Sequence, residues 1–281
     1  MRVAVTGASG FIGTHLIPKL LKAGHTVTAI GRSMQNLPNK EITTEIELIQ
    51  CDLNNISVQL KKNLEKQDAL IHLAWSDLSN YRNLIHLSEL YPLHLRFLKE
   101  AASHGIPHIQ VAGTCLEYGN QFGLLSEDMM TSANTPYGLS KDSLRRSLEF
   151  LQSEIPFTLQ WFRIFYVYGV GQNSKSLYSQ LNKAIELKEA VFKMSQGDQI
   201  RDFISVDLVA EIFCQALKYQ HVNGVINCCS GQPTSVIDFV EGIIKDQNAS
   251  ISLLKGFYPR LDYEPLAFWG NADKLRKIFS K

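Results

Sequence analysis

The first 165 residues alternate between short apolar runs rich in β-branched residues and longer segments of mixed, helix-like periodicity. Short apolar runs bounded by turn residues predict buried strands, and longer periodic segments predict helices. The expected strands are residues 1–6, His25–Ile30, Glu45–Gln50, Asp68–Leu73, His108–Ala112 and Phe157–Ile164. The expected helices are Thr14–Ala23, Tyr81–Gly105 and Tyr137–Ser153, and Ser33–Thr44 is expected to be a polar loop. Such alternation predicts an α/β fold with a Rossmann-type, doubly wound parallel sheet.

After about residue 165 the pattern changes, which predicts a smaller C-terminal lobe. Helices are expected at Lys175–Lys188 and Asp207–Tyr219, strands at Ala190–Met194 and Gly224–Cys229, and further lobe elements at Ser235–Lys245 and Asn271–Phe279. We therefore divide the chain into a nucleotide-binding domain, 1–165, and a substrate lobe, 166–281. The division is discontinuous, because residues 203–229 are expected to return to the main sheet. The aromatic and proline-rich stretch Tyr258–Pro265 is expected to be an ordered loop near a substrate.

Composition narrows the class of protein. The chain has 281 residues, 45% of them hydrophobic and 20% charged, and a formal net charge of +1. These values predict a globular protein and give no reason to expect nucleic acid or a membrane as partner. The five cysteines show no metal-ligand spacing and the eight histidines are scattered, so we expect reduced thiols, no metal site and a cytoplasmic location.

Three glycines spaced three apart follow the first strand: Gly7, Gly10 and Gly13. Strand, glycine turn and helix together are the context of a dinucleotide-binding fingerprint. Gly7 would permit the tight turn, Gly10 the close approach of a pyrophosphate, and Gly13 the packing of helix on sheet. The alternative is a glycine-rich turn of another α/β protein.

The end of the second predicted strand bears on the choice of dinucleotide. NAD-binding chains usually carry an acidic residue there, which accepts from the ribose 2′-hydroxyl. This chain has Gly31, followed by Arg32 and Ser33. A guanidinium can pair with a 2′-phosphate, so we predict NADP, with NAD as the alternative and a solvated surface role for Arg32 as the other interpretation.

A tyrosine and a lysine four residues apart, Tyr137 and Lys141, begin a predicted helix. This spacing places both side chains on one helical face. A nearby ammonium favours the phenolate, so it is expected to lower the tyrosine pKa, and such a phenol can exchange a proton with an alcohol or ketone. Tyr-x-x-x-Lys alone is common by chance, but here it follows a dinucleotide loop and a strand that ends near Thr114.

With these motifs the chain resembles the extended short-chain dehydrogenases/reductases, of the NAD(P)-dependent sugar-nucleotide epimerase, dehydratase and reductase group. The resemblance also covers Gly113–Gly119 and Arg201–Asp207. It implies that Thr114 binds the substrate oxygen, Tyr137 donates the proton, and Lys141 holds the nicotinamide ribose. Asp52 and Leu53 would lie at the adenine, although Asp52 could instead cap the following turn.

The resemblance assigns further residues. Arg201 would bind the substrate diphosphate, with a surface ion pair as its alternative, while Asp202 would support its own loop. The remaining cofactor contacts are expected from Phe11, Ile12, Leu73 and Ala74. A homodimer through the helix after Tyr137 and the helix of residues 81–105 is a further expectation.

The residues after Thr114 bear on the reaction. Dehydratases of this group carry an acid–base pair there, whereas this chain has Cys115 and Leu116, and Glu117 is expected to face elsewhere. Cys115 is either an additional acid–base or a small buried hydrophobe. The leading hypothesis is NADP-dependent reduction of a nucleotide-linked 4-keto-6-deoxysugar. The alternatives are an NAD-dependent nucleotide-sugar 4-epimerase and a non-catalytic NADP-binding regulator, which typically lacks the Tyr/Lys pair retained here.

Overall fold

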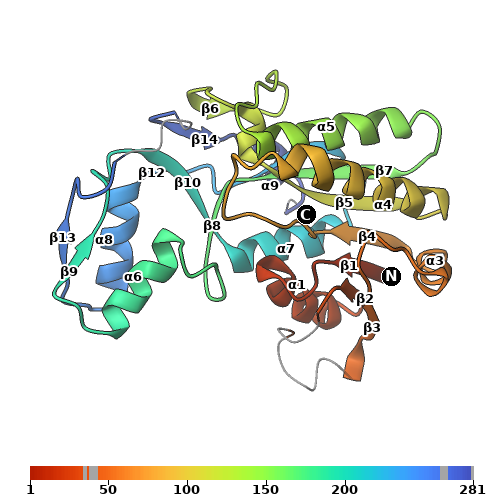
Figure 1. The fold of residues 1–281 in the computed structure, drawn as a ribbon, viewed down its shortest axis with the longest axis horizontal. Helices are drawn as coiled ribbons and strands as arrows, with labels where there is room; N and C mark the ends of the chain where they lie inside the picture. The colour runs from red at the N-terminus through yellow and green to blue at the C-terminus, as the bar shows by residue number, and fades with distance from the viewer. Residues whose placement is uncertain (34–36, 38–43, 260–264, 280–281) are drawn as a thin grey trace.

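The computed structural model of the chain describes residues 1–33, 37, 44–259 and 265–279 (Figure 1). Most of the predicted polar loop, and residues 260–264 of the predicted substrate loop, lie outside the described residues. The centre of the fold is a seven-stranded sheet in which every pairing is parallel. In spatial order its strands are β11 (Gly224–Cys228), β7 (Thr158–Ile164), β5 (His108–Thr114), β4 (Ala69–His72), β1 (Arg2–Thr6), β2 (Thr26–Gly31) and β3 (Glu47–Gln50). The predicted α/β class and doubly wound parallel sheet are confirmed.

Helices cover both faces of this sheet (Figure 1). Helices α1 (Phe11–Lys22) and α7 (Val206–Ala216) pack on one face, and α3 (Val58–Leu64), α4 (Tyr91–Ser103) and α5 (Pro136–Leu151) on the other. Successive residues of a strand point to opposite faces, so Val3 and Val5 enter the first core while Ala4 enters the second. A sheet buried on both faces needs near-continuous apolar strands, which is why its strands were readable from the sequence.

The strand order reverses at β1. The chain runs outward from β1 to β2 and β3, then returns to place β4 on the other side of β1. Thr6 and His72 therefore stand side by side at the carboxyl ends of two strands whose following segments diverge. In open parallel sheets, ligands bind in the crevice at this switch point.

Short strands and two helices lie outside the main sheet, most of them in the C-terminal part of the chain. Strands β8 (Tyr166–Tyr168), β10 (Ile200–Ser205) and β12 (Pro233–Ser235) form one small sheet. Two further strand pairs are β9 (Val191–Lys193) with β13 (Ser252–Leu254), and β6 (Gly123–Leu125) with β14 (Phe268–Gly270). Helices α6 (Leu177–Glu186) and α8 (Val236–Asp246) enclose a separate core, whereas α9 (Asp273–Arg276) packs against β11 of the main sheet.

The segment predicted as one helix over Tyr81–Gly105 is divided. Regular helix starts only at Tyr91, after a π-helical turn, η1 (His86–Leu90). Before it, the side-chain oxygens of Asn80 and Asn83 accept from backbone N–H groups two residues further on. Asparagine offers the backbone such local alternatives to a helix, which explains the delayed start.

Three global features complete the fold. All five cysteines are free and buried. Among the residues described, no three His, Cys, Asp or Glu side chains gather where they could hold a metal ion. None of the described helices has both the length and the apolar character needed to cross a membrane.

Candidate active site

The glycine turn after β1 fits a dinucleotide. Gly7 has a φ of +70°, and a Cβ there would lie 2.8 Å from the backbone nitrogen of Ala74. A Cβ on Gly13 would come within 2.4 Å of the Gly7 carbonyl oxygen. Helix α1 begins after Gly10 without a side-chain cap, so the N–H groups of its first turn remain available to an anion. The turn therefore has the shape and the polarity that a pyrophosphate needs.

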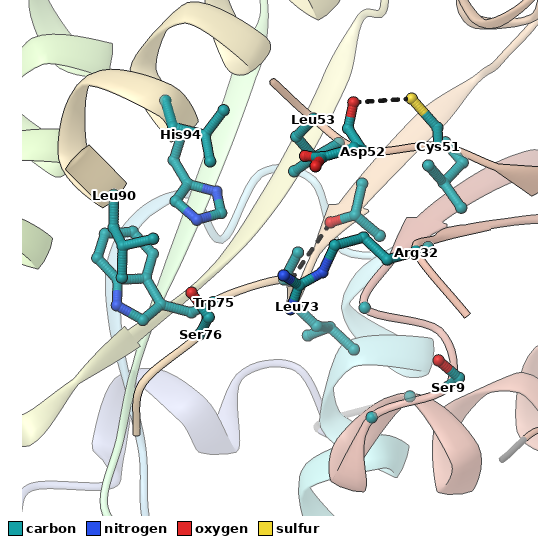
Figure 2. Close-up of a pocket in the computed structure, with 18 of the residues that line it drawn as sticks. Ser9, Arg32, Cys51, Asp52, Leu53, Leu73, Trp75, Ser76, Leu90 and His94 are labelled. Carbon is teal, nitrogen blue, oxygen red and sulfur yellow. Dashed lines mark hydrogen bonds between the residues drawn. The ribbon is translucent and has the colours of Figure 1, made fainter. Parts of the chain in front are cut away.

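A groove of about 580 Å³ extends from this turn across the ends of β1, β2 and β4 (Figure 2). It is lined by all the predicted cofactor-binding residues that precede α5, namely Gly7, Gly10, Phe11, Ile12, Gly13, Arg32, Asp52, Leu53, Leu73 and Ala74. The exposed side chain of Arg32 extends into the groove. Asp52 lies at the groove wall, and its Oδ1 accepts from the backbone and the side chain of Asn54, so it also shapes its own turn.

The predicted catalytic residues meet in a second cavity of about 520 Å³. Thr114 ends β5, and Tyr137 and Lys141 lie on the first turns of α5; all three line this cavity. The hydroxyl of Thr135 accepts from Gly138 N and so caps the helix. A Cβ on Gly138 would lie 2.6 Å from the carbonyl oxygen of Leu116, so glycine lets α5 pack tightly against the 3-10 turn η2 (Cys115–Tyr118) that follows β5.

Tyr137 is buried among aromatic rings. Its ring stacks on Tyr81 at 4.9 Å, and it is 8% exposed. Burial raises its pKa well above 10, and a hydrogen bond with Thr114 acts against this shift. The expected lowering of the tyrosine pKa by Lys141 is not seen, because burial has the largest effect on this pKa; Lys141 Nζ lies 6.0 Å from the Tyr137 ring centroid and donates to Ala112 O. At neutral pH the phenol therefore keeps its proton.

Lys141 is buried between a backbone carbonyl group and an aromatic ring. Its Nζ donates to Ala112 O at 2.8 Å and lies 3.9 Å from the ring centroid of Trp75. Burial lowers its pKa to about 7, and the charge of Glu117 acts in the opposite direction. The indole N–H of Trp75 donates to His86 Nδ1, which orients the ring.

Glu117 lies beneath the site. It faces away from the cavity, as predicted, but it is fully buried. Its carboxylate accepts from Thr114 N at 2.9 Å, from Trp161 Nε1 at 2.9 Å and from Arg163 Nε at 2.8 Å. Burial raises its pKa, against the effect of the Arg163 charge. Glu117 thus fixes the turn that carries Thr114. Its bond to Thr114 N belongs to a capping box, for which the Thr-x-x-Glu spacing is a local sequence signal, whereas its pairing with Arg163, 46 residues away, has none.

Arg201 is buried and, unlike the other predicted site residues, lines neither of the two cavities. It is 1% exposed, donates to Ile200 O and Leu266 O, and lies over the rings of Tyr166 and Phe268. Of the two cavities described, neither is lined by Arg201, whereas Tyr166 lines the second. Its contact with a diphosphate stays a prediction. Asp202 accepts from the backbone of Ser230, Gly231 and Gly270 and so supports its loop.

Five apolar side chains line both cavities and so mark where these adjoin: Phe11, Ile12, Leu73, Trp75 and Leu78. Cys115 and Leu116 line the second cavity, and no described Asp or Glu does. The arrangement therefore joins a dinucleotide groove to a chamber with a phenol, a hydroxyl and an ammonium. It can transfer a proton beside a bound nicotinamide, but it lacks the carboxylate expected for removal of water.

Known proteins share this organisation. The sequence model of the NAD dependent epimerase/dehydratase family matches residues 3–229. The chain belongs to this family. It is therefore an enzyme of the nucleotide-sugar oxidoreductase and epimerase type.

Three known proteins illustrate the similarity. The dTDP-6-deoxy-L-talose 4-dehydrogenase (NAD(+)) of Aggregatibacter actinomycetemcomitans is 31% identical over 96% of this chain and 99% of its own length. The structure of MoeE5 in complex with UDP-glucuronic acid and NAD is 26% identical, with a TM-score of 0.82 over 99% of this chain and 92% of that chain. The UDP-N-acetylglucosamine 4-epimerase from Methanobrevibacter ruminantium M1, in complex with UDP-N-acetylmuramic acid, is also 26% identical, with a TM-score of 0.82 over 100% and 92% of the two chains.

Proposed function

We propose that this enzyme interconverts the 4-keto and 4-hydroxy forms of a nucleotide-linked 6-deoxyhexose, acting as a nicotinamide-dependent 4-ketoreductase. The observation that carries the proposal is the convergence of Thr114, Tyr137 and Lys141 in a chamber that opens onto the dinucleotide groove. The similarity to a 6-deoxyhexose 4-dehydrogenase over nearly the whole of both chains supports the substrate class.

The residues of the chamber divide the work. A bound nicotinamide dinucleotide supplies the hydride that reduces the C4 carbonyl. Tyr137 keeps its proton at neutral pH and can deliver it to the developing C4 alkoxide. The Thr114 hydroxyl orients the same oxygen, and Glu117 holds Thr114 in place. Lys141 holds the nicotinamide ribose, and in its protonated form it brings a positive charge beside the forming alkoxide.

The form of the dinucleotide is a finer proposal. The glycine turn and the uncapped start of α1 fit the pyrophosphate of either form. Gly31 provides no carboxylate for the adenosine ribose, and the guanidinium of Arg32, which lines the groove, could neutralise a 2′-phosphate, so we favour NADP(H). NAD(H) is the alternative, since the 4-dehydrogenase relative is named for NAD(+) and MoeE5 holds NAD.

Arg32→Ala tests this choice. The variant should lose NADP(H) affinity roughly ten- to a hundredfold relative to NAD(H), because a charged hydrogen bond contributes about 1.5–3 kcal/mol. Affinities for both dinucleotides are measured by titration calorimetry, with Arg96→Ala, an exposed arginine on α4, as the matched control. Equal losses for the two dinucleotides, or none, would exclude the assignment.

A nucleotide-sugar 4-epimerase is the second candidate, supported by the likeness to the Methanobrevibacter enzyme. It would use the same three residues and return the hydride to the opposite face of C4. Incubation of a 4-hydroxy nucleotide sugar with a catalytic amount of oxidised dinucleotide separates the two. An epimerase inverts C4 of all the sugar without net consumption of dinucleotide, whereas a 4-dehydrogenase/reductase stops when the dinucleotide is reduced and gives no C4 epimer.

The role of Tyr137 is tested by Tyr137→Phe, which removes one oxygen and keeps the ring stacked on Tyr81. Turnover should fall by about 10²–10⁴, the usual worth of a positioned acid–base group. Dinucleotide affinity, measured separately, should stay close to wild type. Full activity in this variant would remove the proposed mechanism.

A further inference from the structure

A chain of buried polar side chains crosses the sheet at the switch point between β1 and β4. Thr6 Oγ1 lies 2.8 Å from His72 Nδ1, and His72 Nε2 lies 2.9 Å from His94 Nδ1. The three residues come from β1, β4 and α4, and none is more than 3% exposed. Neither histidine was singled out by the sequence, because their separation of 22 residues places them in contact only after folding.

Burial keeps both rings neutral. It lowers the pKa of His72 well below its usual value and that of His94 to about 3, and the Lys141 charge acts in the same direction on both. A neutral imidazole has one donor and one acceptor nitrogen, so the chain must have a direction.

The direction follows from its first member. Thr6 Oγ1 accepts from the backbone N–H of Ala74, and among the described residues the acceptor within reach of its own hydroxyl proton is His72 Nδ1, so we assign Thr6 as the donor of that bond. His72 then carries its proton on Nε2 and donates to His94 Nδ1, so His94 carries its proton on Nε2. We assign these tautomers from the hydrogen-bond pattern. In it, the Thr6 hydroxyl and His72 Nε2–H each have a protein acceptor, and only the last donor, His94 Nε2–H, has none among the described residues.

That last donor points into the dinucleotide groove. His94 lines the groove and is only 3% exposed. Its Nδ1 contacts His72, and no described residue pairs with its Nε2. Its ring is parallel to the Trp75 indole at 4.4 Å, which keeps it from turning away. Figure 2 shows the ring between Leu53 and Trp75, across the groove from Arg32.

We infer that His94 is a dinucleotide-binding residue, whose Nε2–H donates to a ribose or phosphate oxygen of the bound cofactor. The Thr6–His72–His94 chain serves to fix that tautomer, so the groove presents a neutral donor opposite the cationic Arg32. The inference rests on the proposed function only in requiring that the groove hold a nicotinamide dinucleotide.

The test compares His94→Phe with wild type in direct dinucleotide binding. Phenylalanine keeps an aromatic ring against Trp75 and lacks the donor. Affinity for NADH and NADPH should fall roughly three- to tenfold, as expected for loss of one neutral hydrogen bond. His94→Gln, which restores an N–H donor, should recover part of the loss. The matched control is His25→Phe, at a buried histidine that does not line the groove, and it should leave affinity unchanged.

Fragments locate the acceptor. A penalty seen with ADP-ribose but not with ADP places the contact on the nicotinamide ribose, and a penalty already present with ADP places it on the adenosine diphosphate. Equal affinity of wild type and His94→Phe for all four ligands would overturn the inference and leave the proposed function intact. Absence of dinucleotide binding by wild type would overturn both.

A second measurement needs no variant. In ¹⁵N-histidine-labelled protein, the His94 resonances should show the Nε2–H tautomer, and that proton should become protected from exchange when NADH is added. An Nδ1–H tautomer, or an unchanged Nε2–H signal in the dinucleotide complex, would also overturn the inference.

Discussion

The buried ammonium of Lys141 makes the stability of the free enzyme depend on pH in a calculable way. An unfolded lysine has a pKa of 10.5, whereas Lys141 in the folded chain has a pKa of about 7. The folded pKa is the lower one, so between these values unfolding takes up a proton. Unfolding therefore becomes easier as the pH falls from 10.5 towards 7, by up to about 1.36 kcal/mol per pH unit.

Lys141→Met isolates this contribution. Methionine has a similar unbranched shape and no proton to bind. It leaves Ala112 O without its donor, but that cost is independent of pH and shifts only the offset between the two proteins. From about pH 9.5 to about pH 7.5, wild type should lose about 2.5 kcal/mol of unfolding free energy relative to the variant.

Urea unfolding of dinucleotide-free protein, followed by circular dichroism at several pH values, measures the difference. Effects of all other titrating groups cancel between wild type and variant to first order. Lys66→Met, at an exposed position, controls for replacing any lysine by methionine. A wild-type-minus-variant difference that stays constant across the window would refute the reasoning, because it would mean that Lys141 binds its proton equally in both states.

Two other substitutions test the supports of the site. Glu117→Gln should lower the unfolding free energy by about 3–5 kcal/mol, because it leaves the Arg163 guanidinium buried without its counter-charge. Thermal unfolding measures this loss of stability, and a variant as stable as wild type would contradict the prediction. Arg201→Ala should lower the unfolding temperature, since it removes two hydrogen bonds and a cation between two rings, and should raise KM for the nucleotide sugar while sparing dinucleotide affinity. Unchanged kinetics in a folded Arg201→Ala protein would restrict Arg201 to a structural role.

The sequence predicted the main sheet well because its strands are buried on both faces. Ala69–His72 is apolar except for its last residue, and four of the seven residues of Thr158–Ile164 are apolar, so each appears in the sequence as a short apolar run. The glycine motif and the Tyr137–Lys141 spacing were equally readable, since both depend on residues close together in the chain.

Features that depend on distant partners were missed. The three-residue strands of the smaller lobe carry too few positions to show a period, and they form because another segment lies alongside. The Thr-x-x-Glu spacing could have indicated that Glu117 caps the turn at Thr114, but its pairing with Arg163 and the contact of His94 with His72 appear only after folding. The pKa of Tyr137 was predicted from its helical neighbour, but burial among aromatic rings outweighs that neighbour.

The wall shared by the two cavities also constrains the order of events in a turnover. Trp75 and the other four apolar side chains belong at once to the groove and to the chamber, so neither space is independent of the other. A dinucleotide lying in the groove would complete the boundary of the chamber and limit the orientations open to a sugar. A sugar that enters first would find a chamber without the wall that the dinucleotide provides. The geometry therefore favours a compulsory sequence, with the dinucleotide entering before the sugar and leaving after it.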